Sequence, residues 1–88
     1  MRIKQEYKVR EIAGEHTVII RGRQGADLTK IITLNDSALL LWNSLAGRDF
    51  ETDDAARILA DNYSVEAQTA LRDARAWVRR MQEYGLTD

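Results

Sequence analysis

Apolar residues in the first third of the chain follow the pattern of short β-strands. Aromatic and β-branched residues gather in residues 7–12, in 17–21 and again in 31–34, and these residue types suit the pleated surface of a sheet. Residues 13–16 separate the first two segments. They include Gly14, which adopts positive φ without strain, so the first two strands are expected to form a hairpin.

After the third strand the apolar residues recur at helical spacing, and three helices are expected. Asn35 is a typical N-cap for the first helix, and Gly47 is expected to end it in a left-handed conformation. The second helix is expected to begin at Thr52. The third runs from about residue 66 to 84, where Gly85 ends it. The predicted buried stripes are Ala38, Leu41, Trp42 and Leu45; Ala55, Ile58, Leu59 and Tyr63; and Ala67, Ala70, Leu71, Ala74, Trp77, Val78 and Met81.

Three strands followed by three helices indicate an α+β fold with the helices packed on one face of a small sheet. The sequence contains no linker, internal repeat or low-complexity tract, so residues 1–88 are expected to form a single domain. The third strand is short and is expected at an edge of the sheet beside the helices. An edge strand has unpaired backbone donors and acceptors, which makes it a docking edge for another chain.

The composition narrows the class of function. The 13 Lys and Arg residues against 14 Asp and Glu give a formal net charge of −1, whereas sequence-independent binding of nucleic acid normally needs a basic excess. The chain has no cysteine, which excludes disulfides and thiolate chemistry. No apolar run approaches the roughly 20 residues of a membrane-spanning helix, and the N-terminus lacks the features of a signal peptide. A cytoplasmic protein without a membrane or nucleic-acid partner is therefore expected.

No group of residues predicts catalysis, a metal or a cofactor. His16 is the only histidine and is interpreted as an ordinary surface residue. The pair Asp53-Asp54 is explained by the favourable interaction of acidic residues with the start of a helix. Gly22 and Gly25 predict a loose loop, but they lack the following Lys-Ser/Thr of a phosphate-binding loop.

One charge pattern in the third helix allows two interpretations. Arginines three and four residues apart share one face of a helix, and here they are Arg72, Arg75 and Arg79, with Arg80 beside them. In the first interpretation this is a solvated face that pairs with Asp73 and Glu83. In the second it is a basic row next to the open strand edge, suited to acidic side chains of a bound peptide.

Several motifs together resemble the PqqD-like family. The segment Thr33-Leu34-Asn35-Asp36-Ser37-Ala38, with Leu41-Trp42 and Gly47, is similar to the family stretch LN-x-(T/S)-A-x-x-(I/L)-W-x-x-L-x-G. Thr52-Asp53-Asp54 is similar to its T-x-E helix start. Tyr63-Ser64-Val65, Asp73, Trp77-Val78 and Gly85-Leu86 follow its Y-x-V…D-V-x-x-F-L…G-L pattern, and residues 10–15 resemble its R-x-(V/I)-(A/G)-G-E hairpin. The resemblance spans about residues 7–87.

The resemblance implies a winged helix-turn-helix-like fold, with a three-stranded antiparallel sheet followed by three helices. It also implies a non-catalytic, peptide-binding chaperone that acts in natural product biosynthesis. Such a protein, a RiPP recognition element, captures the leader of a ribosomally made precursor peptide by β-strand addition. The leader lies in a groove against the third helix and is presented to a modifying enzyme, often a radical SAM enzyme.

Carried over to this sequence, the resemblance implies peptide-binding residues Ile31, Ile32 and Thr33 through their backbone groups and Arg72, Arg75 and Arg79 through their charges. It implies no cofactor. Ala74, Trp77 and Glu66 depart from the family pattern, which bears on the shape of the groove. A monomer is expected, with weak homodimers at high concentration. Two alternatives stay open, namely a DNA-binding winged-helix protein and a generic protein-interaction domain.

Overall fold

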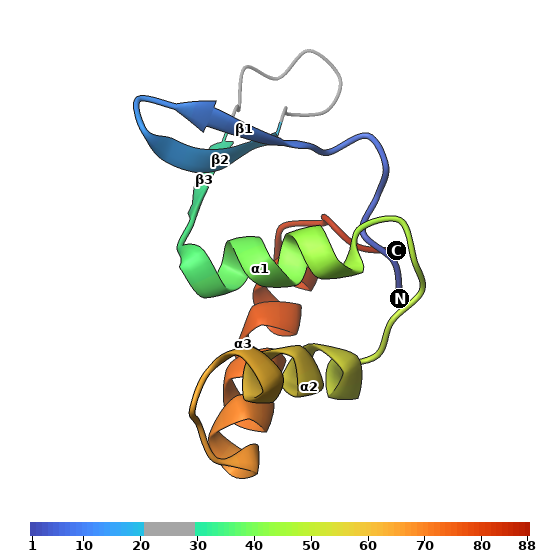
Figure 1. Cartoon of the computed structure of the whole chain (residues 1–88). Helices are drawn as coiled ribbons and strands as arrows, with labels where there is room; N and C mark the ends of the chain where they lie inside the picture. The colour runs from blue at the N-terminus through green and yellow to red at the C-terminus, as the bar shows by residue number, and fades with distance from the viewer. Residues whose placement is uncertain (21–29) are drawn as a thin grey trace.

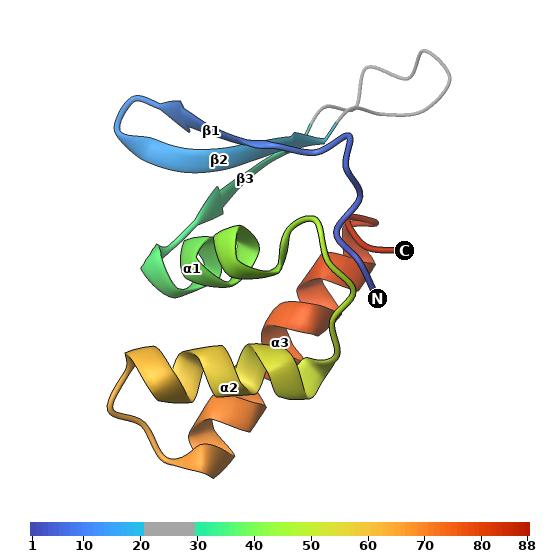
Figure 2. The same ribbon diagram turned by 45° about the vertical axis from the view of Figure 1, so that its right-hand side comes forward.

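The computed structural model describes residues 1–20 and 30–88. Its strands are β1 (Val9–Ile12), β2 (Glu15–Ile20) and β3 (Lys30–Leu34), and its helices are α1 (Asp36–Leu45), α2 (Thr52–Asn62) and α3 (Ala67–Glu83). The strands form one antiparallel sheet in the order β1-β2-β3. The helices lie on one side of this sheet, and α1 is the nearest to it (Figures 1 and 2). The α+β fold with strands first and helices second is confirmed. The winged helix-turn-helix relationship stays a prediction, and the loop predicted at Gly22 and Gly25 lies outside the described residues.

The hairpin between β1 and β2 is tighter than the sequence predicts. Ile12 pairs with Glu15, so the loop contains only Ala13 and Gly14, both at positive φ of 53° and 81°. Positive φ at both central residues is typical of a type I′ turn, whose twist matches that of the two strands. The prediction of a loop over residues 13–16 is therefore wrong at its second half, because the short turn lets Glu15 and His16 pair within the sheet.

The helix ends follow the expected chemistry, with one difference at the end of α1. Helix α2 begins at Thr52 as predicted, and its N-cap is Glu51, whose amide donates to the Asp54 side chain at 2.8 Å. At the end of α1 the chain leaves the helix at Ala46, which is extended, and Gly47 follows at φ 83°. Gly47 is thus left-handed as predicted, but as the second central residue of a turn closed by the Arg48 amide on the Leu45 carbonyl. This is the geometry of a type II turn.

One apolar core joins the sheet to all three helices. It includes the predicted stripe residues Leu41, Trp42, Leu45, Ala55, Leu59, Ala70, Ala74, Trp77, Val78 and Met81. Five residues of the predicted stripes are not fully buried: Ala38, Ile58 and Leu71 are half-buried, Ala67 is exposed and Tyr63 is 39% exposed. Ala67 and Leu71 lie in the first turns of α3, and Tyr63 lies just beyond the end of α2, so the helices are less completely covered there.

The two ends of the chain are held together, which the hydrophobic pattern did not predict. Ile3 and Thr87 form a β-bridge, and the Lys4 amide donates to the Leu86 carbonyl at 2.9 Å. Ile3 is only 3% exposed and belongs to the core. The first residues are therefore a structural part of the fold rather than a free end. Within residues 1–20 and 30–88, no helix is both long enough and apolar enough to cross a membrane.

We expect Ile3→Ala to lower the free energy of unfolding by about 2–5 kcal/mol, the usual cost of truncating a buried aliphatic side chain. The matched control is Ile31→Ala, because Ile31 is 62% exposed and its truncation should cost about 1 kcal/mol or less. Urea denaturation followed by circular dichroism measures both. Equal costs for the two variants would show that the amino-terminal segment does not contribute to the core.

Candidate functional site

A groove of about 660 Å³ lies between β3 and the helices. Each element contributes one part of its wall. The lining residues are Ile32, Thr33 and Leu34 of β3; Asn35, Ser37, Ala38 and Leu41 at the start of α1; Leu59, Tyr63 and Val65 at the end of α2; and Asp73, Trp77, Arg80, Met81, Tyr84 and Leu86 of α3 and its end. A concave site with mostly apolar walls and a few polar groups is typical of ligand pockets.

Strand β3 forms an open wall of this groove because it pairs on one side only. It follows β2 at the edge of the sheet order β1-β2-β3, so no other described strand lies beside it. Side chains alternate along a strand, and Ile32 and Leu34 are the more buried residues of β3 while Ile31 and Thr33 are exposed. The edge therefore offers backbone hydrogen-bonding groups beside a partly apolar surface.

The junction between β3 and α1 is fixed by a side-chain cap. The Asn35 Oδ1 atom accepts from the Ala38 amide at 2.9 Å and from the Ser37 hydroxyl at 3.0 Å. This satisfies one of the amides that a helix start leaves unpaired. Because Asn35, Ser37 and Ala38 all line the groove, the cap also sets the shape of its wall where the strand ends.

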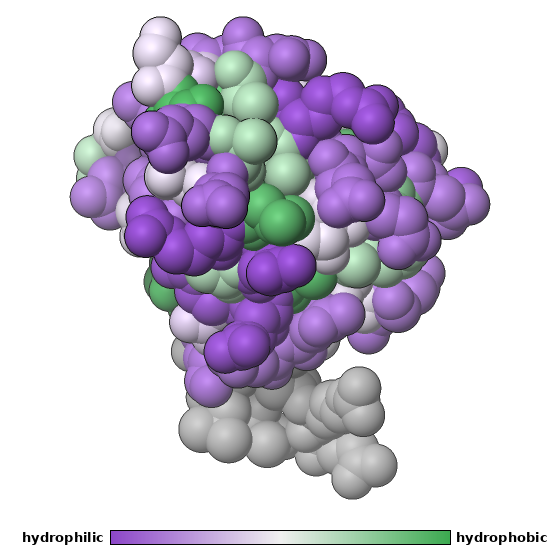
Figure 3. All heavy atoms as spheres, turned by 90° about the horizontal axis from the view of Figure 1, so that it is seen from below, coloured by the Kyte–Doolittle hydropathy of each residue, from purple (hydrophilic) through white to green (hydrophobic). Residues whose placement is uncertain are grey.

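Exposed apolar side chains concentrate at the groove. Three of the five large apolar residues that stand exposed in the described part of the chain, Tyr63, Val65 and Tyr84, line it. Exposed apolar residues that cluster usually mark a binding surface. By contrast, the face seen from below Figure 1 is polar over most of its area, with smaller apolar patches between polar residues (Figure 3). The sequence pattern missed both tyrosines as site residues, because helical spacing placed Tyr63 on a buried stripe and gave Tyr84 no role beyond the end of the third helix.

The floor of the groove includes Trp77, which is 5% exposed. Its ring lies 5.9 Å from that of Phe50, measured between centroids, and its indole N–H is buried with no hydrogen-bond partner among the described residues. The prediction that Trp42 and Trp77 are core residues is confirmed. The Trp77 side chain also lines the groove, so it belongs to both the core and the groove wall.

Among the described residues that line the groove, one is a cation and one a carboxylate, Arg80 and Asp73. Asp73 lies near its neighbour Arg72, with Oδ1 3.5 Å from Nε. Arg80 makes no ion pair within the described chain. A ligand in the groove would thus meet one uncompensated positive charge, and an acidic group of the ligand is its natural partner.

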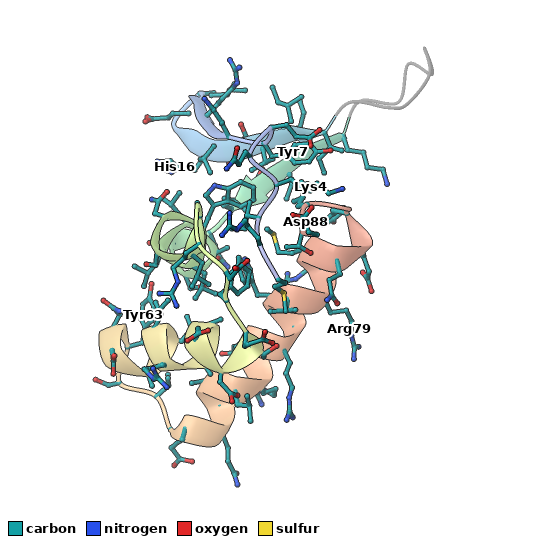
Figure 4. All side chains as sticks on the ribbon, turned by 90° about the vertical axis from the view of Figure 1, so that its right-hand side faces the viewer. Lys4, Tyr7, His16, Tyr63, Arg79 and Asp88 are labelled. Atoms are coloured by element: carbon teal, nitrogen blue, oxygen red, sulfur yellow. The ribbon has the colours of Figure 1, made fainter. Side chains whose placement is uncertain are left out.

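The structure does not bring the two halves of the expected peptide site together. Ile32 and Thr33 line the groove and Ile31 lies next to it. The three predicted arginines instead line a separate shallow hollow on the exposed face of α3, with Gln68, Leu71 and Ala76. In Figure 4, Tyr63 beside the groove and Arg79 on α3 lie on opposite sides of the molecule, and the Arg79 side chain extends outward.

His16 lies in β2 and pairs with Leu34 of β3 (Figure 4). It is half-buried rather than a freely exposed surface residue. Within the described residues no three histidine, cysteine or acidic side chains come close enough to hold a metal ion. The groove presents hydrogen-bonding edges, apolar walls, one cation and one carboxylate.

Comparison with known proteins gives one family. The family described as Coenzyme PQQ synthesis protein D (PqqD) matches residues 16–86. This segment contains β3, the groove and all three helices. No curated protein and no solved structure matches the chain.

We expect Asn35→Ala to lower the free energy of unfolding by about 0.5–2 kcal/mol, because it removes the cap of α1. The control is Asn43→Ala, at an exposed position inside the same helix, where alanine has the higher helix propensity and should be neutral or stabilising. Thermal or urea unfolding of both variants measures the difference. A loss at Asn43 as large as that at Asn35 would contradict the role of the cap.

Proposed function

The chain belongs to the PqqD family, and from its groove we propose that it captures the leader of a ribosomally made precursor peptide and presents it to a modifying enzyme. Family membership alone supports the coarser statement of a non-catalytic accessory protein in the biosynthesis of PQQ or of related modified peptides. Peptide capture is the finer proposal, and it rests on the geometry of the groove.

The observation that carries the proposal is that an open sheet edge forms a wall of an apolar groove. β3 has no described strand on its outer side, and Ile32, Thr33 and Leu34 line the groove. An extended peptide that pairs with this edge gains main-chain hydrogen bonds, and every second side chain of the peptide turns toward the groove. Backbone bonding then supplies affinity, while the groove selects the side chains.

The proposed backbone contacts lie on Ile31, Ile32 and Thr33, but not all three contribute equally. In an antiparallel pair the backbone groups of successive residues point alternately toward the two neighbouring strands. Ile31 and Thr33 therefore share one direction and Ile32 has the other. A bound peptide uses one of these sets, and the opposite set pairs with β2.

The side-chain contacts follow from the walls of the groove. Trp77, Met81 and Leu59 provide buried or nearly buried apolar surface, and Tyr63 and Tyr84 lie exposed at its rim. Arg80 supplies the positive charge. We assign to Arg80 the contact with an acidic leader residue, because the row Arg72, Arg75 and Arg79 faces a different side of α3. Successive helical residues differ by about 100° in direction, which separates Arg80 from Arg79.

A titration of ¹⁵N-labelled protein with a synthetic leader peptide of its cognate precursor should shift the amides of residues 31–34. It should also shift the Trp77 indole and the amides near Arg80, because these groups line the groove. The amides of the turn at Ala13 and Gly14 serve as the internal control and should not move. Shifts confined to that turn, with residues 31–34 unchanged, would show that the groove is not the peptide site.

We expect Ile32→Pro to weaken leader binding about tenfold or more. Proline has no amide hydrogen, so it either removes a bond to the peptide or breaks the pairing with β2 that holds the edge in place. Arg10→Pro in β1, the other edge strand, is the control for a proline in the sheet. Isothermal titration calorimetry measures affinity, and circular dichroism reports whether each variant folds.

A second pair of variants tests the groove without altering the strand. Arg80→Glu should weaken leader binding, whereas Arg57→Glu on α2 makes the same charge change at an exposed position outside the groove. Unchanged affinity in both Ile32→Pro and Arg80→Glu, with the fold intact, would exclude this groove as the binding site.

A further inference from the structure

We propose that the exposed face of α3, defined by Gln68, Leu71, Arg72, Arg75, Ala76 and Arg79, binds an acidic surface of the modifying enzyme while the groove holds the peptide. This inference rests on the proposed function and adds the place where the enzyme docks. The six residues form one shallow hollow on a single helix and share no residue with the groove. We call this surface the arginine face.

The fold does not use the charges of the arginine face. The core side of α3 consists of Ala70, Ala74, Trp77, Val78 and Met81, none of which belongs to the hollow. Among the described residues, Arg75 and Arg79 make no ion pair, and Arg72 contacts only its chain neighbour Asp73 at 3.5 Å. Glu83, one turn after Arg79, forms no ion pair either.

This arrangement carries a cost in the isolated protein. Arg72 and Arg75 are three residues apart and Arg75 and Arg79 four apart, so like charges are neighbours on one face, which destabilises a helix slightly. The favourable interaction of cations with a helix end is limited to the last turn, and Arg72 and Arg75 lie before it. A partner with carboxylates removes this repulsion and gains arginine–carboxylate bonds, so the charge pattern indicates an acidic partner.

The chemistry of the face favours a protein over a nucleic acid. Half-buried Leu71 and exposed Ala76 flank the arginines on the two sides of the row, so apolar surface borders the charges, and protein interfaces combine apolar area with arginine. Arginine is enriched in such interfaces, whereas DNA affinity depends on many basic contacts. Here the whole chain has a formal net charge of −1, and the first turn of α3 begins after Glu66 with Ala67, Gln68 and Thr69 rather than basic residues.

The position of the face allows both partners to bind together. Arg79 extends away from the helices on the side opposite Tyr63 (Figure 4), so an enzyme on the arginine face leaves the β3 edge and the rim tyrosines accessible. The two sites lie on different sides of α3. About 10–12 Å, the diameter of a helix with its side chains, separates the arginine face from the groove wall on that helix. The peptide is thereby held next to the enzyme without direct competition.

The test uses the full chain and its cognate modifying enzyme. Arg75→Glu combined with Arg79→Glu should weaken enzyme binding about tenfold or more and reduce its dependence on salt. Leader affinity in the groove should stay within about twofold, because neither residue lines it. Lys8→Glu combined with Arg10→Glu makes the same change in net charge at exposed positions near β1 and should leave both affinities unchanged. Calorimetry at low and high salt measures each pair.

The outcomes separate this inference from the proposed function. If the Arg75→Glu/Arg79→Glu variant binds the enzyme as tightly as the unaltered protein does and still binds the leader, the arginine face is not the enzyme site. The groove proposal then stands. Absence of leader binding in the unaltered protein contradicts the groove instead. Tighter binding of a nonspecific DNA duplex than of the enzyme, lost in the Arg75→Glu/Arg79→Glu variant, would assign the face to nucleic acid. Self-association lost in that variant, seen by sedimentation, would assign it to a second copy.

Discussion

Burial of the apolar side of α3 is the constraint on which the rest of the structure depends. Ala70 and Ala74 are almost fully buried, and these small side chains allow close packing of α2 against α3. Trp77, Val78 and Met81 continue the same side toward the sheet and the chain ends. Once this stripe is buried, the direction of every other side chain on α3 is fixed. Arg80 and Asp73 then face the groove, and Arg72, Arg75 and Arg79 face away from it.

The groove exists because the sheet stops at β3 while the helical layer continues. A fourth strand would occupy the space that the start of α1, the end of α2 and the groove side of α3 now border. Two local devices keep the walls in position. The Asn35 cap fixes how the chain turns from β3 into α1, and the pairing of residues near Ile3 with those near Thr87 holds the end of α3. The site is therefore a property of several elements rather than of one motif.

Membership of the PqqD family and the arrangement of α3 together suggest an adaptor with two working sides. One side of the helix forms an apolar wall beside unpaired backbone groups, which suits an extended peptide. The other presents closely spaced guanidinium groups, which suit carboxylates. In the function proposed above, the peptide and the enzyme occupy these two different sides of α3, so they do not compete for one surface.

The sequence by itself determined the order of elements, the Asn35 cap, the left-handed Gly47 and most core residues, because these depend on local propensity and on periodicity. It also indicated β3 as a docking edge. Tertiary structure alone decided that Ile3 belongs to the core and that Tyr63 and Tyr84 line a groove, since pairing between distant segments leaves no periodic signal. It also decided on which side of α3 the arginines lie relative to β3. A helical pattern shows which residues share a face, but only packing against the sheet shows what that face meets.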